Sequence, residues 1–249
     1  MLTGDFEAYI PDEFNGALYG LEGVLATMEG AGIDFSVVFP GGVPPDPRAI
    51  NRLTLEACRG EDRLLPGCLV NPTMGAVAVD DLCRCVDHGA RTVKLMAALH
   101  GYRVDSTCVD PVMEAAAERG IPATIHSGSE RAGCTPTYIA ALAGRHPTVT
   151  IIMDHMGYRE WTRLAVDAAT AHPNIILGTT LIAAAEPITI KQIVEEGHVG
   201  ADRIAFGSNA PSGMAKAGVE GICEVGFAPE DEAAILGGTL TSIYAISLG

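Results

Sequence analysis

The sequence of 249 residues predicts a single parallel (β/α)8 barrel, on three observations. Short apolar segments alternate with helical patterns along the whole chain, which is typical of a parallel sheet covered by helices. The length suits one barrel domain, residues 1–249, and no linker or low-complexity tract divides it. Polar residues recur just after the apolar segments, where the mouth of such a barrel is built. We therefore expect one barrel, slightly distorted.

The first half of the chain supplies four strand-and-helix units. A short strand ends near Tyr9, and the next strand, 35–39, is an apolar run bounded by turn residues. The proline- and glycine-rich run 40–47 predicts a loop at the barrel mouth. The third and fourth units are expected as strands 64–70 and 92–96, with helices 76–87 and 111–119. The first helix is indicated by apolar residues at helical spacing, namely Leu18, Leu21, Val24, Leu25 and Met28.

The second half repeats the same rhythm. Strands are expected at 123–126, 150–153, 175–177 and 204–206. The intervening helices are expected near 136–145, 160–171 and 188–196. The last helix should begin at Pro229, because the acidic residues 230–232 suit the positive end of the helix dipole.

Polar side chains stand at the ends of six of these strands. In a parallel barrel these ends converge on one face, so residues far apart in the sequence would meet in one pocket. That convergence is the main indication of function. The six residues are Glu7, Asn71, Lys94, His126, His155 and Asn209.

Four of the six are candidate catalytic residues. The neutral imidazoles of His126 and His155 could bind a metal or transfer protons near pH 7, although a hydrogen-bonded barrel histidine without chemistry is the alternative. Glu7 could bind metal, act as an acid or base once burial has raised its pKa, or pair with Lys94. Lys94 could hold an anionic substrate, stabilise an oxyanion or neutralise Glu7.

Five further residues are candidates for binding a substrate. The phenol of Tyr9 and the amides of Asn209 and Asn71 offer hydrogen bonds. Arg103 and Arg159 follow strand ends and could clamp a carboxylate with two parallel hydrogen bonds, although a solvated loop charge is the alternative for each.

Composition narrows the classes of partner and compartment. The formal net charge of −15 disfavours binding to nucleic acid and to anionic membranes, because a negatively charged protein does not neutralise their negatively charged groups. Seven cysteines, an odd number without a CxxC pair, and the absence of a secretory signal indicate the cytoplasm. We expect a small-molecule substrate, no nucleic acid and no membrane. A homodimer is compatible with the sequence.

The order of these segments resembles the amidohydrolase superfamily, in particular the amidohydrolase-2 branch of small-molecule hydrolases and non-oxidative decarboxylases. The resemblance covers nearly the whole chain and implies a barrel enzyme, a hydrolase or lyase. It rests on four motifs in the right order. These are Lys94 followed by 101–105, then 121–128, then 145–147 leading into 154–157, and finally 200–208.

Two positions depart from the family pattern. Members usually open with a metal-binding His-x-His or Glu-x-His, and here Glu7 is followed by Tyr9. The eighth strand usually supplies an Asp, and here it supplies Asn209. Both changes weaken metal binding. We therefore expect no tightly bound metal, or one weakly bound zinc or manganese ion held by Glu7, His126 and His155.

Three hypotheses follow from these residues. The first is an enzyme that acts on a small organic acid or carbonyl compound by acid/base chemistry, with reduced or absent metal dependence. Hydrolysis, decarboxylation and another lyase- or cyclase-type reaction all stay open. The second is an ordinary single-metal hydrolase or decarboxylase using zinc or manganese. The third is a non-catalytic barrel that binds a small molecule.

Overall fold

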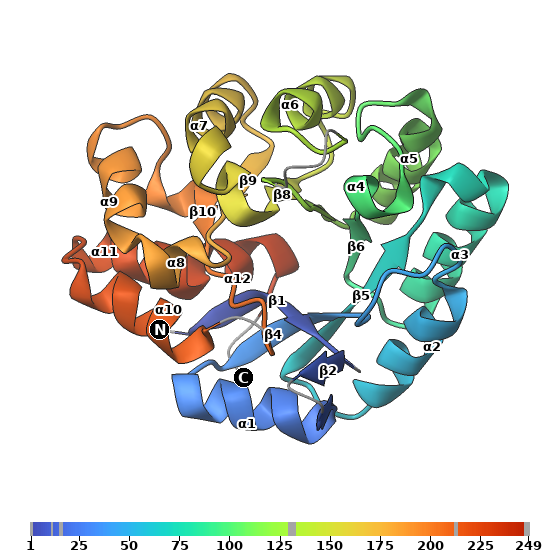
Figure 1. The fold of residues 1–249 in the computed structure, drawn as a ribbon, viewed down its shortest axis with the longest axis horizontal. Coiled ribbons are helices and arrows are strands. Elements are labelled where there is room, and N and C mark those ends of the chain that lie inside the picture. Colours follow the sequence, from blue (N-terminus) through green and yellow to red (C-terminus); the bar gives the residue numbers. More distant parts are fainter. Residues whose placement is uncertain (1, 11, 15–16, 129–132, 212–213, 247–249) are drawn as a thin grey trace.

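Eight parallel strands lie side by side in a ring, with helices around the outside (Figure 1). The computed structural model describes residues 2–10, 12–14, 17–128, 133–211 and 214–246. The expected (β/α)8 barrel is confirmed. In the order of the ring the strands are β1 (Gly4–Tyr9), β4 (Phe35–Phe39), β5 (Leu64–Val70), β6 (Thr92–Leu95), β7 (Ala123–Ile125), β8 (Ile151–Met153), β9 (Ile175–Gly178) and β10 (Ile204–Ala205).

The ring closes between its last and first strands through a few backbone contacts rather than a regular ladder. In the described part of the chain, Phe6 N donates to Phe206 O (3.0 Å) and Asn209 N donates to Glu7 O (2.9 Å). Ala8, inside β1, forms a parallel bridge with Ala210, which lies beyond the end of β10. The barrel is therefore nearly closed, as the expectation of a slight distortion anticipated.

The helices follow the strands in alternation. They are α1 (Leu21–Ala31), α2 (Arg48–Ala57), α3 (Ala76–Asp87), α4 (Ala97–His100), α5 (Asp110–Arg119), α6 (Pro136–Arg145), α7 (Thr162–Ala171), α8 (Ile182–Ala185), α9 (Pro187–Glu195), α10 (Ala215–Glu224), α11 (Pro229–Ala233) and α12 (Thr239–Tyr244). A π-helical turn, Ala234–Gly238, joins the last two. Short 3-10 turns occupy Pro72–Met74, Thr107–Val109, Asp154–Gly157, Arg159–Trp161 and Ala201–Arg203. No helix in the described part is long and apolar enough to cross a membrane.

Several elements differ from the sequence prediction. Leu18 does not belong to the first helix, because it lies in a small antiparallel hairpin of β2 (Asp12–Phe14) and β3 (Ala17–Tyr19). Helices α2 and α10 and the short helices α4 and α8 are not among the predicted elements. The glycines of α10 lower its helix propensity, but they serve packing. A Cβ at Gly218 would lie 2.9 Å from the Phe206 ring, and one at Gly221 would lie 2.3 Å from Ala183 O. Close approach of α10 to its neighbours explains both glycines.

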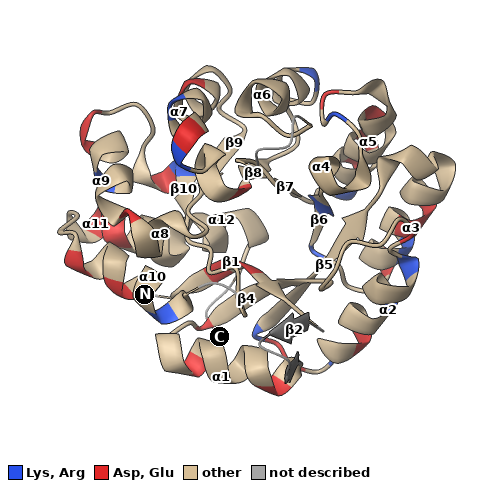
Figure 2. Ribbon diagram, in the orientation of Figure 1, with Lys and Arg blue, Asp and Glu red and all other residues tan. Residues whose placement is uncertain are grey.

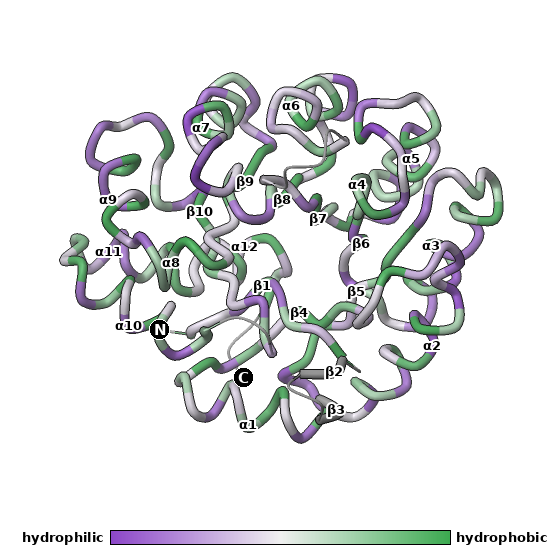
Figure 3. Tube along the Cα trace, in the orientation of Figure 1, coloured by the Kyte–Doolittle hydropathy of each residue, from purple (hydrophilic) through white to green (hydrophobic). Residues whose placement is uncertain are grey.

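Two apolar layers hold the barrel together. The larger lies between the strands and the helices, and the smaller fills the barrel interior. Figure 3 shows hydrophobic residues concentrated along the strands, whereas charged residues lie mostly on the outer helices (Figure 2). Inward-facing residues of neighbouring strands fill the lumen, so the barrel is a packed core rather than a pore. The interior set is Phe6, Phe35, Val37, Phe39, Leu65, Ile152, Ile176, Ala205, Leu240 and Tyr244.

Candidate active site

An irregularity in β1 brings Glu7 into the barrel. The pairing of β1 with β4 shifts register between Asp5 and Ala8. Such a bulge breaks the strict alternation of strand side chains. Phe6 packs in the interior cluster, and its neighbour Glu7 also contacts Lys94, which projects from β6. Figure 2 shows an acidic segment of β1 and a basic segment of β6 within the ring of strands.

Lys94 forms the centre of a buried ion-pair network. Its ammonium donates to Glu7 Oε1 and, at 3.2 Å, to Asp154 Oδ2. Glu7 Oε2 accepts from Thr180 Oγ1 at 2.8 Å, and Glu7 Oε1 also accepts from the phenol of Tyr9 at 2.5 Å. The ion pair considered as one alternative for Glu7 is therefore present. Lys94 and Glu7 are at most 1% exposed, so both lie beneath the surface of the site.

The turn after β8 directs the side chains of two consecutive residues, Asp154 and His155, toward this network. His155 and Met156 have left-handed backbone conformations, with φ values of 59° and 37°. Such conformations are uncommon for residues other than glycine and often occur at functional sites. Ser127 stabilises the turn, since its hydroxyl donates to Asp154 O (2.5 Å) and accepts from Gly157 N (3.0 Å). The turn lets both Asp154 and His155 face Lys94 and His126.

Both candidate histidines converge on one oxygen of Asp154. His155 Nε2 lies 3.4 Å and His126 Nδ1 lies 3.6 Å from Asp154 Oδ2, and the two rings meet edge to face at 4.8 Å. The other nitrogen of His155, Nδ1, faces Thr180 O at 3.4 Å. The side chain of His126 is 20% exposed and that of His155 is 10% exposed, whereas Asp154 is fully buried. The imidazoles are therefore the groups of this cluster that a ligand would reach first.

The charges of the cluster stabilise one another. Burial by itself disfavours a charged Lys94, but Asp154 and Glu7 outweigh it, and the pKa of Lys94 is raised above its ordinary value. Burial also disfavours a charged Asp154, yet His155 and Lys94 hold the pKa of this carboxyl well below its usual range. Asp154 is thus an anion and Lys94 a cation at neutral pH.

Asp5 lies in a second buried layer under the network. Its Oδ1 accepts from the backbone N–H groups of Glu7 and Ser208, both at 2.9 Å. Its Oδ2 accepts from the hydroxyl of Ser208 at 2.6 Å and faces that of Ser36 at 3.4 Å. Burial raises the pKa of Asp5 from 3.8 to about 7, although the hydrogen bonds from Ser208 and Glu7 oppose the rise. Asp5 thereby ties β1 to the segment after β10, next to Glu7.

The structure brings together Glu7, Lys94, His126 and His155, whose catalytic roles remain predictions. Asn209 lies alongside, since its backbone N–H donates to Glu7 O (2.9 Å) and its φ is 57°. Tyr9 is tied to Glu7, as described above. Both stay predicted substrate-binding residues.

The other three predicted binders have contacts elsewhere. Asn71 caps the turn Pro72–Met74 and donates to Pro45 O at 2.8 Å. Arg103 is 56% exposed and pairs with Asp105 at 2.7 Å. Arg159 is 53% exposed and pairs with Glu186 at 2.9 Å. A substrate role for these three residues stays a prediction, and for the arginines it would require exchange of their present partners.

Two residues of the cluster were missed by sequence reasoning. Asp154 stands beside His155 in the motif 154–157, but only His155 is among the predicted site residues. In a regular strand these two neighbours would face opposite sides. A pair of polar residues directly after an apolar strand, followed by Gly157, was the available signal. Thr180 follows β9 without any pattern that distinguishes it from Thr179, so its contact with Glu7 could not have been found.

The site has a ligand set that fits a divalent metal. One atom each from His126, Asp154 and His155 lies within 4.8 Å of the others. Two imidazoles and a carboxylate are ligands that zinc and manganese accept. Asp154 Oδ1 is buried without a hydrogen-bond partner among the described residues. This set contains Asp154 in place of the expected Glu7, which is bound by Lys94.

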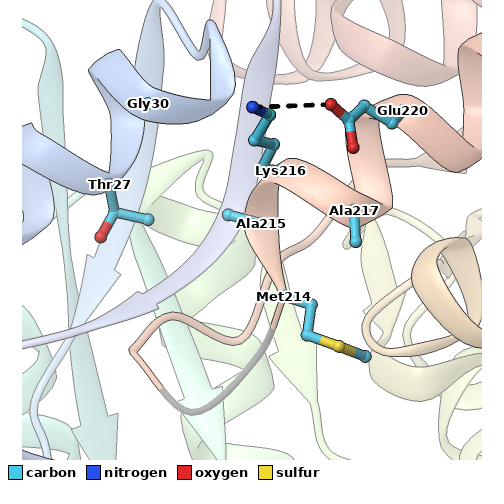
Figure 4. Close-up of a pocket in the computed structure, with 7 residues that line it drawn as sticks. All are labelled: Thr27, Gly30, Met214, Ala215, Lys216, Ala217 and Glu220. Carbon is cyan, nitrogen blue, oxygen red and sulfur yellow. Dashed lines mark ion pairs between the residues drawn. The ribbon is translucent and has the colours of Figure 1, made fainter.

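A surface hollow of about 490 Å³ lies apart from this cluster, between α1 and α10 (Figure 4). It is lined by Thr27, Met214 and Lys216, among others, and Lys216 pairs with Glu220. It contains none of the residues at the strand ends, so we do not assign the reaction to it.

Comparisons with known proteins agree with this geometry. The amidohydrolase family model matches residues 8–239. No curated protein sequence matches the chain. An uncharacterised TIM-barrel protein of Bordetella bronchiseptica superposes with a TM-score of 0.78 at 20% identity, covering 98% of this chain and 99% of the other.

Two decarboxylases also share the fold. The 2,6-dihydroxybenzoate decarboxylase from Rhizobium has a TM-score of 0.77 at 18% identity, with 98% of each chain covered. A dihydroxybenzoic acid decarboxylase from Polaromonas, solved with manganese and an inhibitor, has a TM-score of 0.72 at 16% identity, covering 89% of this chain and 85% of the other. At these identities the similarity demonstrates the barrel alone.

Proposed function

We propose the following reaction from the premise that this chain belongs to the amidohydrolase family, as a hydrolase or lyase. The enzyme transfers a proton to or from a small organic acid or carbonyl compound through His126 and His155. Among the reactions that the sequence left open, the one we propose is non-oxidative decarboxylation of a hydroxylated carboxylic acid. The observation that carries the proposal is the convergence of both imidazoles on Asp154 Oδ2 above the buried Lys94.

The buried charges explain how an imidazole would work as an acid. Lys94 helps keep Asp154 ionised, and this carboxylate lies beside both imidazoles, so the protonated form of either ring, an imidazolium, faces a negative charge. That imidazolium, on His126 or His155, gives its proton to the substrate carbon that bears the carboxylate. The carbon–carbon bond then breaks, carbon dioxide leaves, and the imidazole takes a new proton from solvent. Proton transfer by a positioned side chain contributes about 10²–10⁴-fold to a rate.

A metal-dependent form of the enzyme is the second candidate. His126, Asp154 and His155 would hold the ion, and the unpartnered Asp154 Oδ1 favours this reading. When bound, a zinc or manganese ion would polarise a substrate oxygen. Reduced metal dependence is part of our proposal, because Lys94 already binds the same carboxylate.

The test is a substrate screen with matched variants. Purified protein is incubated with hydroxylated benzoates, including 2,6-dihydroxybenzoate, in deuterium oxide, and carbon dioxide release and deuterium in the product are measured. Each assay is run with chelator and with added zinc or manganese. His126→Asn and His155→Asn should each lower the rate at least about 100-fold. His198→Asn is the control, because His198 is exposed and pairs with Glu196.

The outcomes separate the candidates. Deuterium incorporation that persists in chelator supports the proton-transfer reading. Activity only with metal supports the second candidate. Equal activity in all three histidine variants would contradict both.

A further inference from the structure

The ammonium of Lys94 lies between the two carboxylates of the cluster formed by Glu7, Lys94, His126, Asp154 and His155. It contacts Glu7 Oε1 on one side and Asp154 Oδ2, at 3.2 Å, on the other. The rings of Phe39 and Tyr9 face it at 4.9 and 5.0 Å from their centroids, a distance at which aromatic faces attract cations. A fixed positive charge therefore already sits between the two carboxylates.

We infer that Lys94 is a built-in cation that competes with a divalent metal for Asp154 and keeps the metal affinity of the site low. This inference rests on the proposed function only in taking the cluster as the reactive site. Asp154 Oδ2 is the oxygen shared by the ammonium and both imidazoles. A metal bound to this oxygen would have to share it with a like charge, in a buried setting where like charges repel strongly.

Glu7 is not available as a ligand that would strengthen metal binding. Both of its oxygens are engaged, Oε1 by Lys94 and Tyr9 and Oε2 by Thr180. Lys94 thus holds apart two groups of potential ligands, Glu7 on one side and the set of His126, Asp154 and His155 on the other. A covalently attached cation cannot be removed by a chelator. The imidazoles keep their lone pairs for proton transfer whenever no metal is bound to them.

The inference predicts that removing the ammonium creates a tighter metal site. Chelator-treated wild type and Lys94→Met are titrated with zinc and, separately, manganese, by calorimetry without substrate. We expect Lys94→Met to bind one ion per chain at least about tenfold more tightly than wild type, since the ligand set then meets no like charge. Equal or weaker affinity would overturn the inference, and so would tight binding of one ion by wild type.

Matched variants separate charge from misfolding. Lys94→Met leaves Glu7 buried without its partner, so Glu7→Gln with Lys94→Met is titrated as well, and this neutral pair should show the same gain. Glu7→Gln alone retains the ammonium and should show none. Adding Asp154→Asn to the double variant should abolish the gain.

Failure of this inference is distinguishable from failure of the proposed function. The affinities are measured without turnover, so they stand whatever substrate is found. A gain in affinity without any proton-transfer activity would support the inference and contradict the proposed function. Activity in chelator together with unchanged metal affinity in every variant would support the proposed function and contradict the inference about Lys94.

Discussion

The substitution Asp5→Asn should remove a pH dependence of stability that originates in one buried carboxyl group. Asp5 is 2% exposed, and burial raises its pKa from 3.8 to about 7. Asparagine has the same shape, and its oxygen can still accept from the N–H groups of Glu7 and Ser208. Its amide nitrogen can donate to the hydroxyl of Ser208. The variant therefore changes the ionisation and little else.

The sign and size follow from proton linkage. A carboxyl group with a raised pKa binds more protons folded than unfolded, so it lowers the free energy of unfolding as pH rises from 3.8 to about 7. At about 1.4 kcal/mol per pKa unit the full effect is about 4 kcal/mol. Between pH 5 and pH 8 about 2.5 kcal/mol of it is expected, because part is already lost at pH 5.

Urea unfolding at pH 5 and pH 8 measures this difference. The free energy of unfolding of Asp5→Asn, taken relative to that of wild type, should rise by about 2.5 kcal/mol from pH 5 to pH 8. The control is Asp62→Asn, since Asp62 is exposed, and it should show no such gain. If Asp5→Asn and wild type differ by the same amount at both pH values, Asp5 does not titrate in this range and the reasoning is refuted.

Two further predictions concern packing and hydrogen bonding around Glu7. Gly207→Ala should lower the free energy of unfolding by about 1–3 kcal/mol, because its Cβ would lie 2.4 Å from the Phe6 ring and 2.7 Å from Thr180 Oγ1. In urea unfolding, the double variant Gly207→Ala/Phe6→Leu should lose less free energy of unfolding than the sum of the two single losses. Additive losses would contradict a contact between position 207 and the Phe6 ring. Tyr9→Phe should cost about 1.5–3 kcal/mol in the same assay, since it removes a hydrogen bond to a charged carboxylate. A loss below about 0.5 kcal/mol would show that the phenol hydroxyl stabilises little.

The barrel and its two histidines could be predicted from the sequence because both depend on local patterns. Alternation of apolar runs and helical periodicity predicts a parallel sheet, and the end of each run places His126 and His155 at one face. The small hairpin β2–β3 and the glycine-containing α10 could not be predicted from these patterns. The hairpin is too short to alter the alternation of strands and helices. Helix α10 depends on contacts of Gly218 and Gly221 that propensity does not record.

The arrangement of the site was decided by tertiary structure alone. Lys94 and Glu7 are 87 residues apart in the chain, and the register shift in β1 turns Glu7 toward Lys94. Asp154 and His155 are consecutive, and in an extended strand they would face opposite sides. The left-handed backbone at His155 and Met156 directs both to one cluster. No local pattern in the sequence specifies that backbone conformation, because the packing around the turn imposes it at a cost in local energy.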